Sequence, residues 1–169
     1  QWYIHRHVNQ LFAGVKNIDN QSLLIPEPDI PTHAVKEINT VIRALGKAQR
    51  PVLLLGSGAM LQPQLAPQLA HAVKKLGIPV FLSGMARGLL GRSDALQYQH
   101  HRKEALREAD LIILAGVPCD FRLDYGRSLN RHAKKIAVNR SRTELRKNLR
   151  PDRAICADPG AFLVDLEKT

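Results

Sequence analysis

The sequence has few aromatic residues, few cysteines and no long apolar run. Only 5% of its 169 residues are Phe, Trp or Tyr, and two are Cys. The longest apolar runs, 51–55 and 111–118, are far shorter than the roughly 18 residues of a membrane helix, so we expect no transmembrane span within these residues. Cys119 and Cys156 lack metal-ligand spacing and fit buried free thiols of a reducing compartment. We therefore expect a cytoplasmic location. A membrane anchor outside these residues is compatible with that expectation.

Several motifs that carry chemistry are also missing. A nicotinamide dinucleotide fingerprint needs G-x-G-x-x-G and an acid about 20 residues later. Here Leu61 stands where the third glycine belongs, and the next apolar run ends at Ser83 instead of an acid. Ser57 lies in Gly-Ser-Gly-Ala, which is not the nucleophile elbow G-x-S-x-G. We predict that this chain contains no catalytic residue and no metal ligand.

The charge is strongly positive. Lys and Arg number 25 against 15 Asp and Glu, which gives a net charge of +10. Such a balance suits a polyanionic partner, whether nucleic acid, an anionic membrane surface or a phosphate-rich small molecule. A mild basic cluster within 140–153 contains no aromatic residue, whereas proteins that stack on bases combine both kinds of side chain. We expect no nucleic-acid partner and solvated helix faces for most of these charges.

Short apolar runs alternate with helical patterns along the chain. Unbroken apolar runs are typical of strands buried on both faces, which are the strands of parallel sheets. Helical spacing within 33–48 and 65–76 predicts helices, the first capped by Thr32 and the second ended by Gly77. Asp158 is predicted to cap a last helix. We predict a three-layer, doubly wound α/β fold of the Rossmann-like nucleotide-binding type, with five or six parallel strands. The runs that predict strands are 52–55, 80–82, 111–115, 136–138 and 154–156.

The first 32 residues differ from the rest. Residues 1–13 predict an amphipathic helix, and 14–32 contain three prolines between polar residues, a pattern typical of an extended linker. We therefore divide the chain into a helical lead-in and linker at 1–32 and one domain at 33–169. At 169 residues the chain has the length of a single domain.

Candidate binding residues follow the ends of the predicted strands. In an open parallel sheet, ligands bind outside the carboxyl ends of the strands. We predict a rim there that could hold a diphosphate, since glycines allow close approach, the amino end of the helix that follows the first loop favours anions, and Arg pairs with phosphate. The candidates are Gly56, Ser57, Gly58, Arg87, Arg122, Asn139 and Asp158.

The order of motifs resembles a known family. The segments 50–59, 76–80, 85–91, 105–116 and 151–158 resemble the central domain of thiamine-diphosphate-dependent enzymes such as acetolactate synthase, oxalyl-CoA decarboxylase and 2-hydroxyacyl-CoA lyase. The resemblance covers roughly 33–167. Residues 119–126, Cys-Asp-Phe-Arg-Leu-Asp-Tyr-Gly, look most like the acetolactate synthase-like proteins grouped with the 2-hydroxyacyl-CoA lyases.

The resemblance implies a place within a larger enzyme. The family's central domain lies between a pyrimidine-binding and a pyrophosphate-binding domain, which hold thiamine diphosphate and Mg2+, and the full-length enzyme is expected to be a homo-oligomer. In some members the strand-end rim carries FAD, and in some CoA enzymes it carries ADP. Gly56, Ser57 and Gly58 match the first loop of this rim, and Arg87, Arg122 and Asp158 match its other contact positions.

Three departures bear on the ligand. Pro118 replaces an arginine of the family pattern, Asn139 replaces the Asp that ends the fourth strand in FAD-binding members, and Ser141 replaces the next acid. These losses disfavour FAD and leave ADP, a CoA-like ligand or an empty rim open.

The sequence thus favours the non-catalytic central domain of a lyase or synthase that acts on 2-oxo acids or 2-hydroxyacyl-CoA. The isolated chain is predicted to be inactive. A stand-alone module that binds a nucleotide or nucleic acid is the alternative. A domain with an empty rim, which only spaces its neighbours, is the third possibility.

Overall fold

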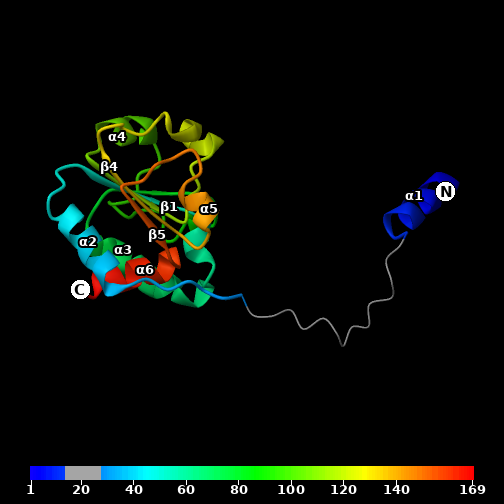
Figure 1. The fold of residues 1–169 in the computed structure, drawn as a ribbon, viewed down its shortest axis with the longest axis horizontal. Coiled ribbons are helices and arrows are strands. Elements are labelled where there is room, and N and C mark those ends of the chain that lie inside the picture. The colour runs from blue at the N-terminus through cyan, green and yellow to red at the C-terminus, as the bar shows by residue number, and fades with distance from the viewer. Residues whose placement is uncertain (14–27) are drawn as a thin grey trace.

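Five strands form one parallel sheet at the centre of the molecule (Figure 1). The computed structural model describes residues 1–13 and 28–169 of the chain. The strands are β1 (Pro51–Leu55), β2 (Val80–Leu82), β3 (Leu111–Ala115), β4 (Lys134–Asn139) and β5 (Arg153–Cys156). They lie in the order β2-β1-β3-β4-β5, and each neighbouring pair is parallel. The predicted α/β class is confirmed, with five strands in the described part of the chain.

Helices cover both faces of the sheet and give the predicted three layers. One face packs against α2 (Val35–Leu45), α3 (Ala66–Leu76) and α6 (Pro159–Glu167). The other face packs against α4 (Arg102–Glu108) and α5 (Arg142–Leu145). In Figure 1, α4 lies across the strands from α2, α3 and α6. The helix after β1, α3, packs on one face of the sheet, whereas the helix after β2, α4, packs on the other. The neighbouring strands β1 and β3 therefore continue into loops that lead to opposite faces.

The unbroken apolar runs follow from burial on both faces. In β3, Ile113 belongs to the core beneath α2, α3 and α6, whereas Ile112 and Leu114 belong to the core beneath α4 and α5. Successive side chains of a strand point to opposite faces, so a strand covered on both sides needs an apolar residue at every position. All five residues of β3 are buried.

The helix boundaries confirm two predicted signals and correct one. Gly77 ends α3 with a left-handed φ of +64°, and Asp158 caps α6 by accepting a hydrogen bond from the Ala161 amide. The prediction that Thr32 caps the next helix is wrong. The cap of α2 is Ala34, whose amide donates to the Glu37 carboxylate at 2.7 Å. The Glu37 carboxylate thus satisfies the amide of the capping residue itself, whereas a capping hydroxyl would accept from an amide of the first turn.

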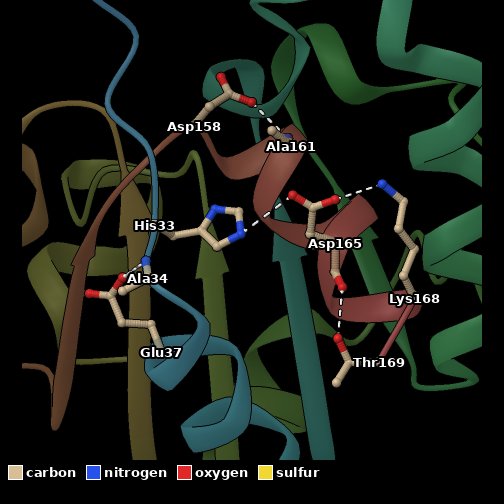
Figure 2. A network of polar contacts seen from close by, with 8 residues as sticks. All are labelled: His33, Ala34, Glu37, Asp158, Ala161, Asp165, Lys168 and Thr169. Carbon is tan, nitrogen blue, oxygen red and sulfur yellow. Dashed lines mark hydrogen bonds and ion pairs between the residues drawn. The ribbon is translucent and has the colours of Figure 1, made fainter.

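The segment before α2 is fastened to α6 (Figure 2). His33 Nε2 lies 3.5 Å from Asp165 Oδ2, and the His33 ring meets the Phe162 ring edge-on at 5.0 Å between centroids. The Asp158 amide donates to the Pro31 carbonyl at 2.9 Å. These contacts fix how the chain enters the domain.

The expected lead-in helix is present as α1 (Trp2–Leu11), and none of its residues is buried. Most of the predicted linker at 14–32 falls on residues 14–27, which lie outside the described residues. Within the described ranges, no helix is long and apolar enough to span a membrane.

Candidate functional site

The candidate site lies where the loops after β1 and β3 separate. This is the switch point of a doubly wound sheet, the usual place for a ligand. A cavity of about 260 Å³ opens there, which we call the rim cavity. Five of the seven predicted residues line it, namely Gly56, Ser57, Gly58, Arg122 and Asn139. The structure therefore brings these five together.

The glycines of the first loop allow two backbones to touch. A Cβ on Gly56 would lie 2.5 Å from the Gly116 carbonyl oxygen, and one on Gly58 would lie 2.8 Å from the Gly116 Cα. Gly116 has a φ of +66° and would itself place a Cβ 2.7 Å from the Gly58 carbonyl carbon. Close packing between the β1 and β3 loops thus accounts for these glycines without a ligand.

The amides of this loop are already engaged. Gly56 N donates to the Ala115 carbonyl at 3.0 Å, and Gly58 N donates to the Gly116 carbonyl at 3.1 Å. The Ser57 hydroxyl accepts a hydrogen bond from the Met85 amide at 3.1 Å. A phosphate in the rim cavity would find neither of these two glycine amides free.

The helix predicted at 65–76 is confirmed as α3, but it does not follow Gly58 directly. Two 3₁₀ turns, Ser57–Met60 and Pro63–Leu65, come first, and α3 begins only at Ala66. Pro67 lies in the first turn of α3 and has no amide hydrogen for the carbonyl four residues before it, so the helix cannot extend further toward the strand. The anion-binding helix end expected at this loop is therefore absent from it.

Arg122 and Asn139 are held by their own loops. The Arg122 guanidinium lies 2.8 Å from the Asp120 carboxylate and 5.1 Å from the centre of the Phe121 ring. Asn139 Oδ1 accepts from the Ser141 amide at 3.0 Å. Beside this loop, burial and then the Asp120 charge raise the pKa of the Cys119 thiol to about 11. Cys119 thus stays protonated and is a poor nucleophile at neutral pH.

Asp158 lies apart from the rim cavity, within the protein. Its side chain is only 3% exposed, and it accepts from the Ala161 amide and from Arg140 Nε, each at 2.7 Å. A second guanidinium nitrogen of Arg140 lies 2.6 Å away. The carboxylate that the resemblance assigns to a nucleotide thus caps α6 and pairs with Arg140.

Arg87 lines a second cavity of about 720 Å³, which we call the arginine cavity. Arg92, Arg102 and His100 line it as well, and no carboxylate does among the described residues. The two cavities adjoin, because Phe81 and Arg102 line both. Positive charge therefore gathers beside β2, while the rim cavity is narrower and largely apolar.

Two charged side chains that line the rim cavity were not predicted, Arg102 and Glu144. The Arg102 guanidinium donates to the Arg122 carbonyl at 2.8 Å. Glu144 Oε1 accepts from Lys147 at 3.1 Å, whereas its Oε2 is buried and has no partner among the described residues. Both belong to the first turns of α4 and α5. The signal was available, because a crossover helix that follows a parallel strand starts at the carboxyl end of the sheet.

The described residues do not form an Mg2+ site. In the described ranges, no three His, Cys, Asp or Glu side chains lie close enough together to hold a metal ion. The two cavities instead offer arginines for an anion and one unpartnered carboxylate oxygen for a hydroxyl or amine.

Comparison with known proteins gives a consistent family. The model of the thiamine pyrophosphate enzyme central domain matches residues 38–166. A 2-hydroxyacyl-CoA lyase 2 from Danio rerio is 44% identical over 99% of this chain and 27% of its own length. The Homo sapiens protein of the same name is 42% identical over 98% of this chain and 26% of its own. An acetolactate synthase large subunit from Mycobacterium tuberculosis is 34% identical over 67% of this chain and 20% of its own. The chain thus spans about a quarter of the length of the two lyases.

Proposed function

Because the chain belongs to the thiamine pyrophosphate enzyme central-domain family, we propose that it serves as the central part of an enzyme that forms or cleaves carbon–carbon bonds. The substrates in this proposal are 2-oxo acids or 2-hydroxyacyl-CoA. Thiamine diphosphate supplies the electron sink for the carbanion, and it is bound with Mg2+ by pyrimidine-binding and pyrophosphate-binding domains in a homo-oligomer. The support is the family match, together with relatives named as a lyase and a synthase.

The first test is turnover. The isolated 169-residue chain, supplied with thiamine diphosphate, Mg2+ and a 2-oxo acid, should release no carbon dioxide above the rate without protein. Turnover that depends on the added cofactor would place a reaction centre within this chain and overturn the proposal.

We further propose that this chain itself binds a nucleoside diphosphate such as ADP or the ADP moiety of CoA. The observation that carries this proposal is the pairing of the two cavities. The arginine cavity offers Arg87, Arg92 and Arg102 to phosphates, and guanidinium groups bind phosphate with paired hydrogen bonds. In the adjoining rim cavity, Glu144 has a buried oxygen without a partner in the described residues, and it can accept from a ribose hydroxyl. The relatives named 2-hydroxyacyl-CoA lyase agree with a CoA-type ligand.

Calorimetric titration of ADP, CoA, FAD and adenosine tests the nucleotide proposal. ADP or CoA should bind saturably, and the double variant R87Q/R92Q should weaken ADP by about tenfold or more, since charge-assisted hydrogen bonds are the strong ones. Adenosine has no phosphate, so the double variant should leave its affinity unchanged, whereas Glu144→Ala should weaken it.

A matched control separates the site from general charge. Lys75 and Arg107 are exposed, line neither cavity and carry the same charge as the arginine pair. The variant K75Q/R107Q should bind ADP like the wild type. Equal losses in both variants, or no saturable binding of any of the four ligands, would contradict a nucleotide site and favour a domain that only spaces its neighbours.

A further inference from the structure

A polar groove lies between α2 and the start of β5. Its volume is about 640 Å³, and its walls come from α2, from the residue after α5 and from the first residues of β5. No residue of the rim cavity or the arginine cavity lines it, so it is a separate surface. We call it the basic groove.

Four cations line the basic groove. Lys36 and Arg43 come from α2, Arg146 follows α5, and Arg153 begins β5. All four are exposed, and none forms an ion pair with another described residue. Four positive charges thus face one groove without a carboxylate neutralising any of them.

The two carboxylates of the groove accept hydrogen bonds from backbone amides. Glu37 accepts from the Ala34 amide at 2.7 Å, and Asp152 accepts from the Lys135 amide at 2.8 Å. Both bonds hold structure, one at the start of α2 and one beside β4. The four cations outnumber these two carboxylates, so the groove has an excess of two positive charges.

The shape and composition of the basic groove select among anionic partners. A compact phosphate is held by donors that converge on one point, whereas these cations stand on three separate elements along an open groove. Stacked nucleic-acid bases need aromatic platforms, and no aromatic side chain lines the groove among the described residues. A second copy of this chain carries the same net charge of +10 and is a weaker electrostatic match for the groove than an acidic segment. An extended chain with spaced carboxylates remains, because each carboxylate can pair with a different cation.

We propose that the basic groove is a docking surface for an extended acidic segment of polypeptide, rich in Asp and Glu, from a partner protein. The cations of α2 and β5 pair with successive carboxylates of that segment. Charge complementarity provides its affinity and its specificity.

Fluorescence anisotropy with a short labelled peptide of alternating Glu and Ser residues tests the proposal. The 169-residue chain should bind it saturably at low salt, and affinity should fall as salt rises, because the pairs are exposed. The triple variant R43Q/R146Q/R153Q should bind about tenfold more weakly, since each exposed pair contributes a modest factor.

The control variant K75Q/R107Q/R127Q removes three exposed cations outside the groove. It should retain wild-type affinity, and circular dichroism should show both triple variants folded. Equal weakening by the two variants would overturn the proposal in favour of general charge attraction. Inorganic phosphate or a DNA duplex that binds as tightly as the peptide, with the same dependence on Arg43, Arg146 and Arg153, would overturn the choice of partner.

Discussion

Replacing Gly116 by alanine tests whether the glycines of the rim pack backbone against backbone. Gly116 has a φ of +66°, and its Cβ would lie 2.7 Å from the Gly58 carbonyl carbon and still closer to the Ala59 amide nitrogen. A left-handed φ costs an alanine about 1–2 kcal/mol. Forcing a methyl group between two backbones adds about 1–3 kcal/mol. We therefore expect Gly116→Ala to lower the free energy of unfolding by about 3–4 kcal/mol.

Gly88→Ala is the matched control. Gly88 also has a positive φ, +90°, but a Cβ there would meet nothing within 4 Å. Only the backbone cost of about 1–2 kcal/mol applies. In a domain of this size each kcal/mol shifts the melting temperature by about 2–4 °C. We thus expect a drop of about 10 °C for Gly116→Ala and about 2–8 °C for Gly88→Ala.

Urea unfolding followed by circular dichroism measures both variants. Equal free-energy losses for Gly116→Ala and Gly88→Ala would refute the packing argument, because the two positions differ mainly in their surroundings. Gly58→Ala adds a third point. Its Cβ would lie 2.8 Å from the Gly116 Cα without a positive φ, so it should cost about 1–3 kcal/mol from crowding alone.

Three further predictions concern single side chains. Asp158→Ala should cost about 2–4 kcal/mol in urea unfolding, because it leaves the Ala161 amide and the Arg140 guanidinium without their partner; a loss below about 1 kcal/mol, typical of an exposed pair, would contradict this. Hydrogen bonds from the Gln49 amide and then the Arg50 amide lower the pKa of Asp110 below 3.8, so its stabilising effect is present above that pH and disappears as the pH falls through the lowered pKa; the stability difference between wild type and Asp110→Asn should shrink in acid, and a pH-independent difference would count against it. Burial raises the pKa of Cys119 from 9.0 to about 11, so the stability gained from its neutral thiol is complete below pH 9 and lost as the pH rises through 11; the advantage of wild type over Cys119→Ala should narrow across that range, and an unchanged advantage would show that the thiol does not titrate as described.

The strands were predictable because strands buried on both faces consist of consecutive apolar residues. The runs at 80–82 and 111–115 match β2 and β3. In a strand covered on both faces every position is apolar, so the first and last apolar residues of the run mark the ends of the strand. Similarly, Gly77 and Asp158 marked helix boundaries through local chemistry. The family resemblance is confirmed as well.

The residues that line the rim cavity were predictable only in part. Gly56, Ser57 and Gly58 do reach the rim, but their use by the neighbouring loop depends on Gly116. Arg87 belongs to a different cavity. No local pattern contains this information, because the partners are distant in the sequence.

The sequence by itself determined the succession of strands and helices along the chain, the boundary signals at Gly77 and Asp158, and the family, since each depends on side-chain periodicity or on residues a few positions apart. Only the tertiary structure decided which polar groups remain free for a ligand. The carbonyls of Ala115 and Gly116, at the end of β3, accept hydrogen bonds from the amides of Gly56 and Gly58. Arg140 forms an ion pair with the carboxylate of Asp158. A hydrogen-bonding group can bind a ligand only when no neighbouring residue already pairs with it, and those neighbours, which are distant in the sequence, are set by the fold.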